Sequence, residues 1–235
     1  MFLTYYQNLK KKKMILKDTD DFKIINILDE KHWHQTRNNG LGGSDASIVL
    51  NVNQYKTAYE LWEEKTGTKE RVFVTNDAIE KGNRCEDPML QLFGALHTEY
   101  EIINTKKITL ISKYWEPARA NLDGVLVDSN GIYGIYEGKT ATIQNMAMIE
   151  NWKDKVPDSY FYQVLHYFAV TQYDYAIIYA LLDFPFWNKQ ELRTYEFYRN
   201  DYLQEINFLV SEEVNFWNNY VAPKIEPPII RNIIL

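Results

Sequence analysis

The stretch from Asn121 to Thr140 constrains the fold of this chain more than any other part of its sequence. An apolar segment runs from Leu122 to Val127, and the polar turn Asp128-Ser-Asn-Gly131 follows it. A second segment, rich in aromatic and β-branched residues, returns from Ile132 to Lys139. Two such segments on either side of a glycine-containing turn are typical of a β-hairpin. The sequence therefore predicts two antiparallel strands, around which the rest of the chain is expected to pack.

The polar residues of this hairpin form a candidate site. Side chains of a strand alternate between its two faces, so Glu137 and Lys139 point the same way, and Asp123 can lie opposite them on the neighbouring strand. Two carboxylates suit a hard cation such as Mg²⁺ or Mn²⁺, and Gly138 could add a backbone carbonyl ligand. Such a cation polarises a phosphoryl oxygen and lowers the pKa of a bound water, which Lys139 would orient. The alternative is a cross-strand Glu–Lys ion pair without chemistry.

The charge balance limits how the chain can contact nucleic acid. Its 26 Lys and Arg residues stand against 32 Asp and Glu residues, so the net charge is −6 and the chain as a whole has no basic signature. Contact with DNA must then come through bound metal or from a local patch. The candidates for that patch are Arg37, Lys56, Lys65, Lys139 and the run Lys10–Lys13, although a charge run at a terminus is more often a solvated tail.

Cysteine usage and hydropathy indicate an intracellular protein. The one cysteine, Cys85, excludes an internal disulfide and suits a reducing compartment. No apolar run approaches the roughly 18 residues of a membrane span. The N-terminus places Phe2 to Tyr6 ahead of the lysine run, which is the reverse of a signal peptide. We expect a cytoplasmic protein with no membrane partner.

The sequence is expected to form a single α/β domain over residues 22–222, since no internal repeat or low-complexity linker divides it. Residues 1–21 are expected to be a disordered N-terminal extension, and residues 223–235 an apolar C-terminal tail that could dock on a neighbouring subunit. Helices are expected at Asp29–Asn38, Ala46–Leu50, Ala58–Thr66, Asn76–Gly94 (or two helices joined near Pro88), Ser159–Thr171 and Asp201–Tyr220. Further strands are expected at Ile102–Ile111, Tyr175–Leu182 and Leu192–Tyr198.

Two further segments carry polar groups that could serve a site. The loop Gly40-Leu-Gly-Gly43 precedes Ser44-Asp45, which we expect to cap the helix that follows. A glycine-rich loop that opens a helix presents backbone N–H groups to an anion. In the fifth expected helix, Tyr160, Gln163 and Tyr167 lie on one stripe. That helix can therefore present polar groups to a cleft.

Three ordered blocks of sequence resemble a known family. The blocks are Arg37–Ala46 with Asn53–Gly67, then Gly82–Pro88, then Asn121–Gly124 with Glu137–Lys139 and Tyr160–Tyr167. In this order they resemble the YqaJ-like viral recombinase family, which includes the phage lambda-type alkaline exonucleases of the PD-(D/E)xK nuclease superfamily. The resemblance covers roughly Arg37 to Leu182.

The resemblance implies a fold and an activity. The fold would be a restriction-endonuclease-like α/β core, with a central mixed β-sheet flanked by helices. The activity would be that of a Mg²⁺-dependent exonuclease, with Mn²⁺ as a possible substitute, which degrades double-stranded DNA 5′ to 3′ from a duplex end. The product would be a 3′ single strand for an annealing protein, in a phage or mobile-element setting. Relatives of the lambda type form ring-shaped trimers, so a homo-oligomer is expected.

The resemblance also implies roles for individual residues. Asp123 and Glu137 correspond to the metal-binding carboxylates and Lys139 to the catalytic lysine, while Glu86 corresponds to an additional acidic residue at a second metal. The other assignments are Arg37 and Ser44 to the pocket for a 5′-terminal phosphate, Gln163 to a helix glutamine beside the scissile phosphate, and Asn121 to a small polar residue that helps to hold phosphate.

Simpler explanations of these residues stay open at this point. Arg37 and Glu86 could be surface charges, Ser44 a helix cap and Gln163 a solvated helix residue. Two other functions also stay open, namely a structure- or sequence-specific endonuclease on the same core, and a DNA-binding module without catalytic activity. The intact set Asp123, Glu137 and Lys139 argues against the last of these.

Overall fold

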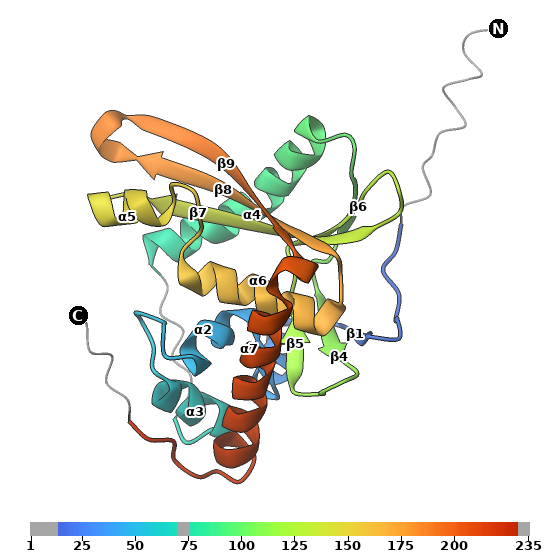
Figure 1. Ribbon diagram of the computed structural model, residues 1–235, viewed down its shortest axis with the longest axis vertical. Coiled ribbons are helices and arrows are strands. Elements are labelled where there is room, and N and C mark those ends of the chain that lie inside the picture. The colour runs from blue at the N-terminus through green and yellow to red at the C-terminus, as the bar shows by residue number, and fades with distance from the viewer. Residues whose placement is uncertain (1–13, 70–75, 230–235) are drawn as a thin grey trace, which may run out of the picture.

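The computed structural model describes residues 14–69 and 76–229, which form two mixed β-sheets with helices around them (Figure 1). The larger sheet has the strand order β3-β6-β7-β8-β9 and the smaller one the order β1-β4-β5-β2. The strands of the larger sheet are β3 (Glu101–Asn104), β6 (Gly124–Val127), β7 (Tyr133–Thr142), β8 (Tyr175–Phe184) and β9 (Lys189–Tyr198). Those of the smaller sheet are β1 (Phe22–Asn26), β4 (Ile108–Ser112), β5 (Ala118–Ala120) and β2 (Leu41–Gly42).

The predicted hairpin is confirmed as the centre of the larger sheet. β6 and β7 pair antiparallel, with Val125 opposite Ile135. The carboxylate of Asp128 closes the turn by accepting backbone hydrogen bonds from Asn130 and Ile132. β7 then continues past β6 and pairs in parallel with β8, which in turn pairs antiparallel with β9. This mixed order agrees with the expected fold class.

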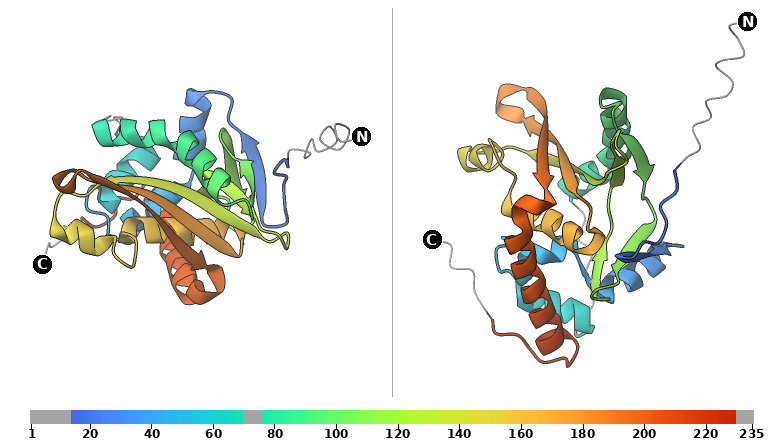
Figure 2. Two further views of the ribbon diagram at one scale, coloured as in Figure 1. Left: turned by 90° about the horizontal axis from the view of Figure 1, so that it is seen from above. Right: turned by 45° about the vertical axis from the view of Figure 1, so that its right-hand side comes forward.

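Two long helices cover the two faces of the larger sheet (Figure 2). They are α4 (Asp77–Leu96) and α6 (Asp158–Thr171). Alternation along β7 separates two apolar clusters, because Tyr136 packs with Phe93 of α4 whereas Ile135 packs with Phe168 of α6. Glu137 and Lys139 share the face of Ile135, and their side chains therefore point toward α6. Pro88 lies within α4 without ending it, so the prediction of one helix is the correct alternative.

A third apolar cluster joins three of the remaining helices. The helices that complete the fold are α1 (Glu30–Asn38), α2 (Gly43–Val49), α3 (Ala58–Thr66), α5 (Met146–Asn151) and α7 (Leu203–Phe216). The start and end of α3 are as predicted, because Thr57 and Glu60 form a reciprocal capping box and Gly67 ends the helix at φ 71°. Leu61 and Trp62 pack inward from α3 against Phe216. α6 and α2 also pack directly on each other.

Two predicted element boundaries are wrong. The strand predicted over Ile102–Ile111 is two strands, β3 and β4, which belong to different sheets. The chain turns between them at Lys107, whose φ is 66°. The helix predicted to start after a Ser44-Asp45 cap begins earlier, at Gly43, with Gly42 as its N-cap residue. Asp45 therefore lies inside the first turn, where its carboxylate accepts the Gly42 N–H at 3.0 Å.

The ends of the chain bear on the predicted domain limits. Leu16 is buried in the main core, so part of the segment expected to be an extension packs on the domain. Lys10–Lys13 and residues 230–235 lie outside the described residues. Residues 223–229 form no helix or strand. Among the described residues, no helix is both long and apolar enough to span a membrane.

Candidate active site

The carboxylates and the amine of the hairpin converge as predicted. Asp123 lies one residue before β6, and its Oδ2 accepts the backbone N–H of Gly138 at 2.8 Å. Lys139 donates from Nζ to Glu137 Oε1 at 2.7 Å. All three side chains line a cavity of about 310 Å³ that opens between the larger sheet, α6 and the start of α2. The remaining residues of this cavity are Arg37, Gly42, Gly43, Ser44, Arg119, Asn121, Tyr160, Gln163 and Tyr167.

The charges of this cluster are held out of solvent. Glu137 is only 3% exposed, and burial together with the negative charge of Asp123 raises its pKa to about 8. Burial also raises the pKa of Asp123, although the charge of Lys139 and the Gly138 N–H oppose the shift. Burial alone would lower the pKa of Lys139, but the carboxylates of Glu137 and Asp123 more than offset this and raise it. One ammonium thus faces two carboxylates, which leaves the cluster short of positive charge.

Gln163 joins α6 to this cluster. Its amide nitrogen donates to Glu137 Oε1 at 2.7 Å and to the Tyr167 hydroxyl at 2.8 Å, and its amide oxygen accepts from Lys139 Nζ at 3.0 Å. The ring of Tyr160 lies under the Lys139 ammonium at 4.7 Å. The predicted stripe on α6 therefore faces the cavity, and Gln163 is buried rather than solvated.

The donor atoms of the cluster fit a hard divalent cation. Glu137 Oε2 is buried and has no hydrogen-bond partner, which is costly for a carboxylate oxygen unless a cation or an ordered water meets it. Within residues 14–69 and 76–229, no three His, Cys, Asp or Glu side chains are grouped closely enough to hold a metal by themselves. Mg²⁺ does not need such a cage, since it is usually bound by one or two carboxylates, by waters and by substrate phosphate oxygens.

The structure gives less support to the other two predicted metal ligands, Glu86 and Gly138. Glu86 lines a neighbouring pocket together with Asp123, not the main cavity. Partial burial and then the charge of Asp123 raise the pKa of Glu86, so the two carboxylates are near enough to interact. Gly138 donates its N–H to Asp123, and a metal-ligand role for its carbonyl stays a prediction.

The predicted phosphate pocket lies across the cavity from the carboxylates. Arg37, in the last turn of α1, donates from Nη2 to Ser44 Oγ at 2.6 Å, and its guanidinium lies 5.2 Å from the centre of the Trp33 ring. A Cβ at Gly43 would come within 2.6 Å of the Tyr167 ring, so only glycine lets α2 approach α6 this closely. The arginine and the serine are thus brought together at the cavity edge.

The expected surface patch of lysines is not present in the described structure. Lys65 is buried, with Nζ 2.8 Å from Asp45 Oδ2 and 3.0 Å from the Arg37 carbonyl oxygen. Lys56 pairs with Glu64 at 2.6 Å, and Lys139 is committed to the cavity. Sequence reasoning counted Lys65 as available because the carboxylate that binds it, Asp45, comes from another segment of the chain.

One predicted residue, Asn121, forms hydrogen bonds with a neighbouring strand, and one residue of the cavity, Arg119, was not predicted. Asn121 is among the residues that line the cavity, but its side-chain amide nitrogen donates to the Ile108 carbonyl oxygen at 3.1 Å and to Thr109 Oγ1 at 2.7 Å. Arg119 lines the same cavity from β5. Its position two residues before Asn121, hence on the same side of an extended segment, is the sequence signal that could have identified it.

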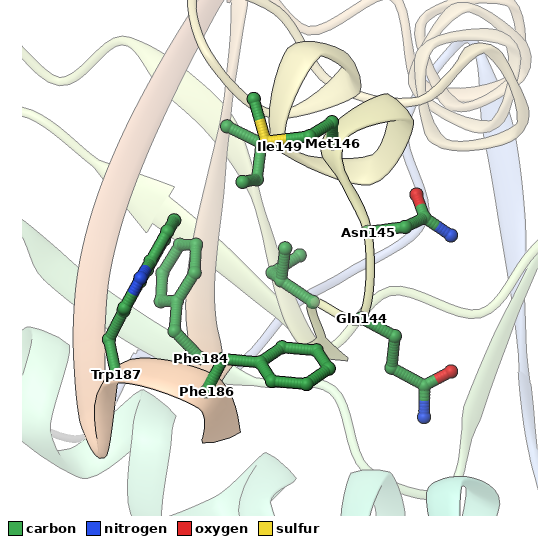
Figure 3. A pocket seen from close by; sticks show the side chains of 8 residues that line it. Gln144, Asn145, Met146, Ile149, Phe184, Phe186 and Trp187 are labelled. Carbon is green, nitrogen blue, oxygen red and sulfur yellow. The ribbon is translucent and has the colours of Figure 1, made fainter.

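A second cavity of about 300 Å³ lies away from this chemistry (Figure 3). Phe184, Phe186 and Trp187 line it near the tip of the β8–β9 hairpin, and Met146 and Ile149 of α5 lie opposite. The residues that line it include no acidic, basic or nucleophilic side chain. Its surface is therefore mostly apolar, and the candidate active site is the charged cavity of similar size.

A mixed sheet with an Asp and a Glu-x-Lys on its central hairpin, facing a helix glutamine, is the α/β fold expected of the PD-(D/E)xK class. Residues 32–174 match the family described as the YqaJ-like viral recombinase domain, and the chain belongs to this family. The family resemblance of the sequence blocks is thereby confirmed.

The chain is similar to the uncharacterized protein YqaJ of Bacillus subtilis (strain 168), with 32% identity over 200 residues. That alignment covers 83% of this chain but 57% of the Bacillus protein, so this chain spans little more than half of its relative.

Solved structures of low sequence identity share the fold. An alkaline exonuclease from Laribacter hongkongensis, LHK-Exo, has 17% identity and a TM-score of 0.57 over 83% of this chain and 94% of its own. The same protein in complex with dAMP gives a TM-score of 0.60 at the same coverage. A phage-related exonuclease from Haemophilus somnus 129PT has 14% identity and a TM-score of 0.50 over 80% and 97% of the two chains.

Proposed function

We propose that this chain is a metal-dependent deoxyribonuclease that hydrolyses double-stranded DNA from an end. The observation that carries the proposal is the convergence of Asp123, Glu137, Lys139 and Gln163 in one cavity, with Arg37 and Ser44 across from them. The names of the structural neighbours, which are exonucleases, and of the recombinase family support the choice of substrate.

Each residue has a chemical task in this proposal. Asp123 and Glu137 hold the cation, which is Mg²⁺ or alternatively Mn²⁺ and which supplies charge neutralisation at the scissile phosphate when bound. Lys139 orients the attacking water and offsets negative charge that develops on the phosphate. Gln163 fixes the orientation of Glu137 and Lys139 through its two hydrogen bonds. Glu86 is proposed as a ligand of a second cation, and Asn121 as a further phosphate contact.

The side of the cavity with Arg37 and Ser44 is the basis for the proposed direction of DNA degradation. Arg37 and Ser44 would hold a 5′-terminal phosphate, because an arginine fork binds a phosphate by two parallel hydrogen bonds. Degradation would then run 5′ to 3′ and leave a 3′ single strand for an annealing protein in the host cytoplasm. A ring of identical subunits would hold the duplex without a strongly basic surface, and the apolar residues 223–235 are its proposed contact.

Linear and covalently closed circular duplexes, incubated side by side with Mg²⁺ and with a chelator, test the proposal. We expect degradation of the linear DNA alone, and only with the metal. Asp123→Ala and Lys139→Ala should each reduce the rate by roughly 10²–10³-fold, the scale of losing one group that stabilises transition-state charge. Lys153→Ala, a change at an exposed lysine outside the cavity, is the matched control and should keep the parent rate.

Three outcomes would contradict the proposal in different ways. Cleavage of the closed circle would favour an endonuclease on the same core, because a circle has no end. Full activity of Lys139→Ala would place the chemistry elsewhere. Absence of hydrolysis together with carboxylate-independent metal binding in calorimetry would leave a DNA-binding module.

A further inference from the structure

Two arginines reach the candidate cavity with donor groups that nothing in the described structure satisfies. Arg37 comes from α1 and Arg119 from β5, and both line the cavity. The Nε atoms of both guanidinium groups are buried without a hydrogen-bond partner. A buried donor without a partner costs about 1–3 kcal/mol, and more when it carries charge, so each such group calls for an explanation, of which a bound water or ligand is one.

The carboxylates whose charges act on these two arginines are each bound to a lysine. Glu116 is the acidic group whose charge Arg119 feels, but Glu116 is bound to Lys23 at 2.8 Å. Asp45 plays the same part for Arg37 and is itself bound to Lys65. Among the described residues, no carboxylate forms an ion pair with either arginine. Two positive charges therefore face one cavity without a direct counter-ion.

The fold holds Arg119 in a fixed position at this cavity. Its Nη1 donates to the carbonyl oxygen of Thr36 at 2.8 Å, which ties the guanidinium to the last turn of α1. A Cβ at Gly40 would lie 2.4 Å from Arg119 Nε, so only glycine leaves room for this side chain. The backbone of Arg119 pairs with Gly42 across β2 and β5, and its carbonyl oxygen accepts from His166 of α6 at 2.9 Å. α6 packs directly on both α2 and β5 (Figure 1).

We propose that Arg119 is a second arginine of the terminal-phosphate pocket and that it determines the preference for phosphorylated over hydroxyl DNA ends. This inference rests on the proposed function of the cavity. A terminal phosphate monoester carries a charge near −2 above its second pKa of about 6, and it offers three acceptor oxygens. An internal diester carries one charge, and a hydroxyl end carries none. Two guanidinium groups from different elements match the monoester best, because their forks can bind different oxygens of the same dianion.

The test compares one duplex sequence with a 5′-phosphate or a 5′-hydroxyl at its only accessible end. Initial rates with Mg²⁺ give the ratio of the two ends for the parent chain, for Arg119→Met and for Arg119→Lys. We expect Arg119→Met to lower that ratio roughly ten- to a hundredfold, the scale of one charge-assisted hydrogen bond, with most of the loss on the phosphorylated end. Arg119→Lys should restore part of the ratio, because it keeps the charge but not the fork.

Two controls separate this role from a structural one. Arg84→Met removes an exposed arginine of α4 that does not line the cavity, and it should leave the ratio unchanged. Inorganic phosphate should inhibit the parent on phosphorylated ends and inhibit Arg119→Met more weakly. An equal loss on both kinds of end would show that Arg119 only supports the fold, and an unchanged ratio in both Arg119 variants would overturn the proposal.

Binding measured without hydrolysis keeps this inference distinct from the proposed nuclease activity. Fluorescence anisotropy with labelled duplex in a chelator reports affinity for each kind of end even if the chain cleaves nothing. A parent that binds phosphorylated ends more tightly, and loses this preference on Arg119→Met, supports the pocket alone. A parent that hydrolyses DNA while all Arg119 variants keep the preference supports the nuclease and contradicts the role of Arg119.

Discussion

The two sides of the candidate cavity are built in different ways. The side with Asp123, Glu137 and Lys139 belongs to one hairpin, so strand register alone brings its groups together. The side with Arg37, Ser44 and Arg119 comes from three elements that meet only in the folded chain. The first arrangement is local and carries the proposed chemistry. The second depends on tertiary packing and carries the proposed recognition of the DNA end.

The two sides also differ in how their charges are balanced. The hairpin side has an excess of negative charge that raises the pKa of Glu137 to about 8, burial being the larger cause and Asp123 the next. The arginine side has positive groups without direct counter-ions, and the buried pair of Asp45 and Lys65 supports one of them through the Arg37 carbonyl oxygen. A cation on one side and a phosphate on the other would each remove an imbalance. The proposed metal and phosphate therefore complement the charges of this cavity better than a neutral ligand would.

The hairpin side should lose the most activity and the least stability on mutation. Glu137→Gln removes a charge that burial disfavours, but it keeps an oxygen that can accept from Lys139 and Gln163. We expect the rate of hydrolysis to fall roughly 10³-fold, as for other charge-stabilising groups, while the melting temperature stays within a few degrees of the parent. Single-turnover kinetics and thermal unfolding measure the two quantities.

Glu150→Gln, at an exposed position of α5, is the matched control for this change. It should alter neither the rate nor the melting temperature. If Glu137→Gln kept a rate within tenfold of the parent, the carboxylate would not be part of the chemistry. If it lowered the melting temperature strongly, the role of Glu137 would be structural.

The arginine side should instead lose stability when its support is broken. Burial alone would raise the pKa of Asp45, but the charges of Lys65 and Arg37 more than reverse this and lower it. Lys65→Met leaves that carboxylate buried without its partner, which costs about 3–5 kcal/mol in the free energy of unfolding. Urea denaturation measures the loss, and Asp45→Asn in the same chain should recover part of it, because the amide can still accept the Gly42 N–H.

Lys56→Met provides the comparison for a partly exposed pair. Lys56 and Glu64 lie 2.6 Å apart with side chains about a fifth exposed. The loss of this ion pair should therefore lower the free energy of unfolding by at most about 1 kcal/mol. Lys65→Met should also weaken the preference for phosphorylated ends more than the rate on hydroxyl ends. Equal destabilisation by the two lysine changes would remove the distinction between the buried support and an ordinary ion pair.

This difference between the two sides also explains what the sequence could predict. Local signals were sufficient for the hairpin, for α3 with its Thr57–Glu60 box, and for the stripe of Gln163 on α6. The same alternation rule placed Glu137 and Lys139 on one face. Each of these predictions depends on residues that are close in the chain, where backbone geometry alone relates their side chains.

The features that sequence reasoning missed depend on distant partners. Arg119 belongs to the cavity only because Gly40 leaves room for its guanidinium and His166 binds its carbonyl oxygen. In the sequence Lys65 cannot be told from a surface lysine, and only its ion pair with Asp45 in the folded chain shows that it is buried. The pairing of β2 with β5 involves only two register positions, too short a segment for any periodic signal.

The pair of His166 and Glu213 gives the smallest expected effect and separates stability from recognition. His166 Nδ1 lies 2.7 Å from the Glu213 carboxylate and Nε2 lies 2.9 Å from the Arg119 carbonyl oxygen. Both partners are acceptors, so both ring nitrogens must donate and the imidazole is favoured in its protonated form. Burial alone would lower the pKa of His166, but Glu213 and the Arg119 carbonyl more than offset this and raise it.

This shift fixes the sign of a pH dependence. A histidine with a raised pKa in the folded state contributes stability that is fully present below its unfolded pKa of about 6.5, and the contribution is lost as the pH rises through the folded value. Between pH 6 and pH 9 the melting temperature of the parent should therefore fall further than that of Glu213→Gln. In a chain of this size each kcal/mol of lost unfolding free energy lowers the melting temperature by roughly 2–4 °C. Thermal unfolding across that range measures the difference, and parallel curves would show that the pair carries no net charge coupling.

Neutral His166 can still donate from Nε2 to Arg119, so the ratio of rates on phosphorylated and hydroxyl ends should change less in Glu213→Gln than in Arg119→Met. A loss of that ratio in Glu213→Gln as large as in Arg119→Met would mean that α7 controls the phosphate pocket through His166.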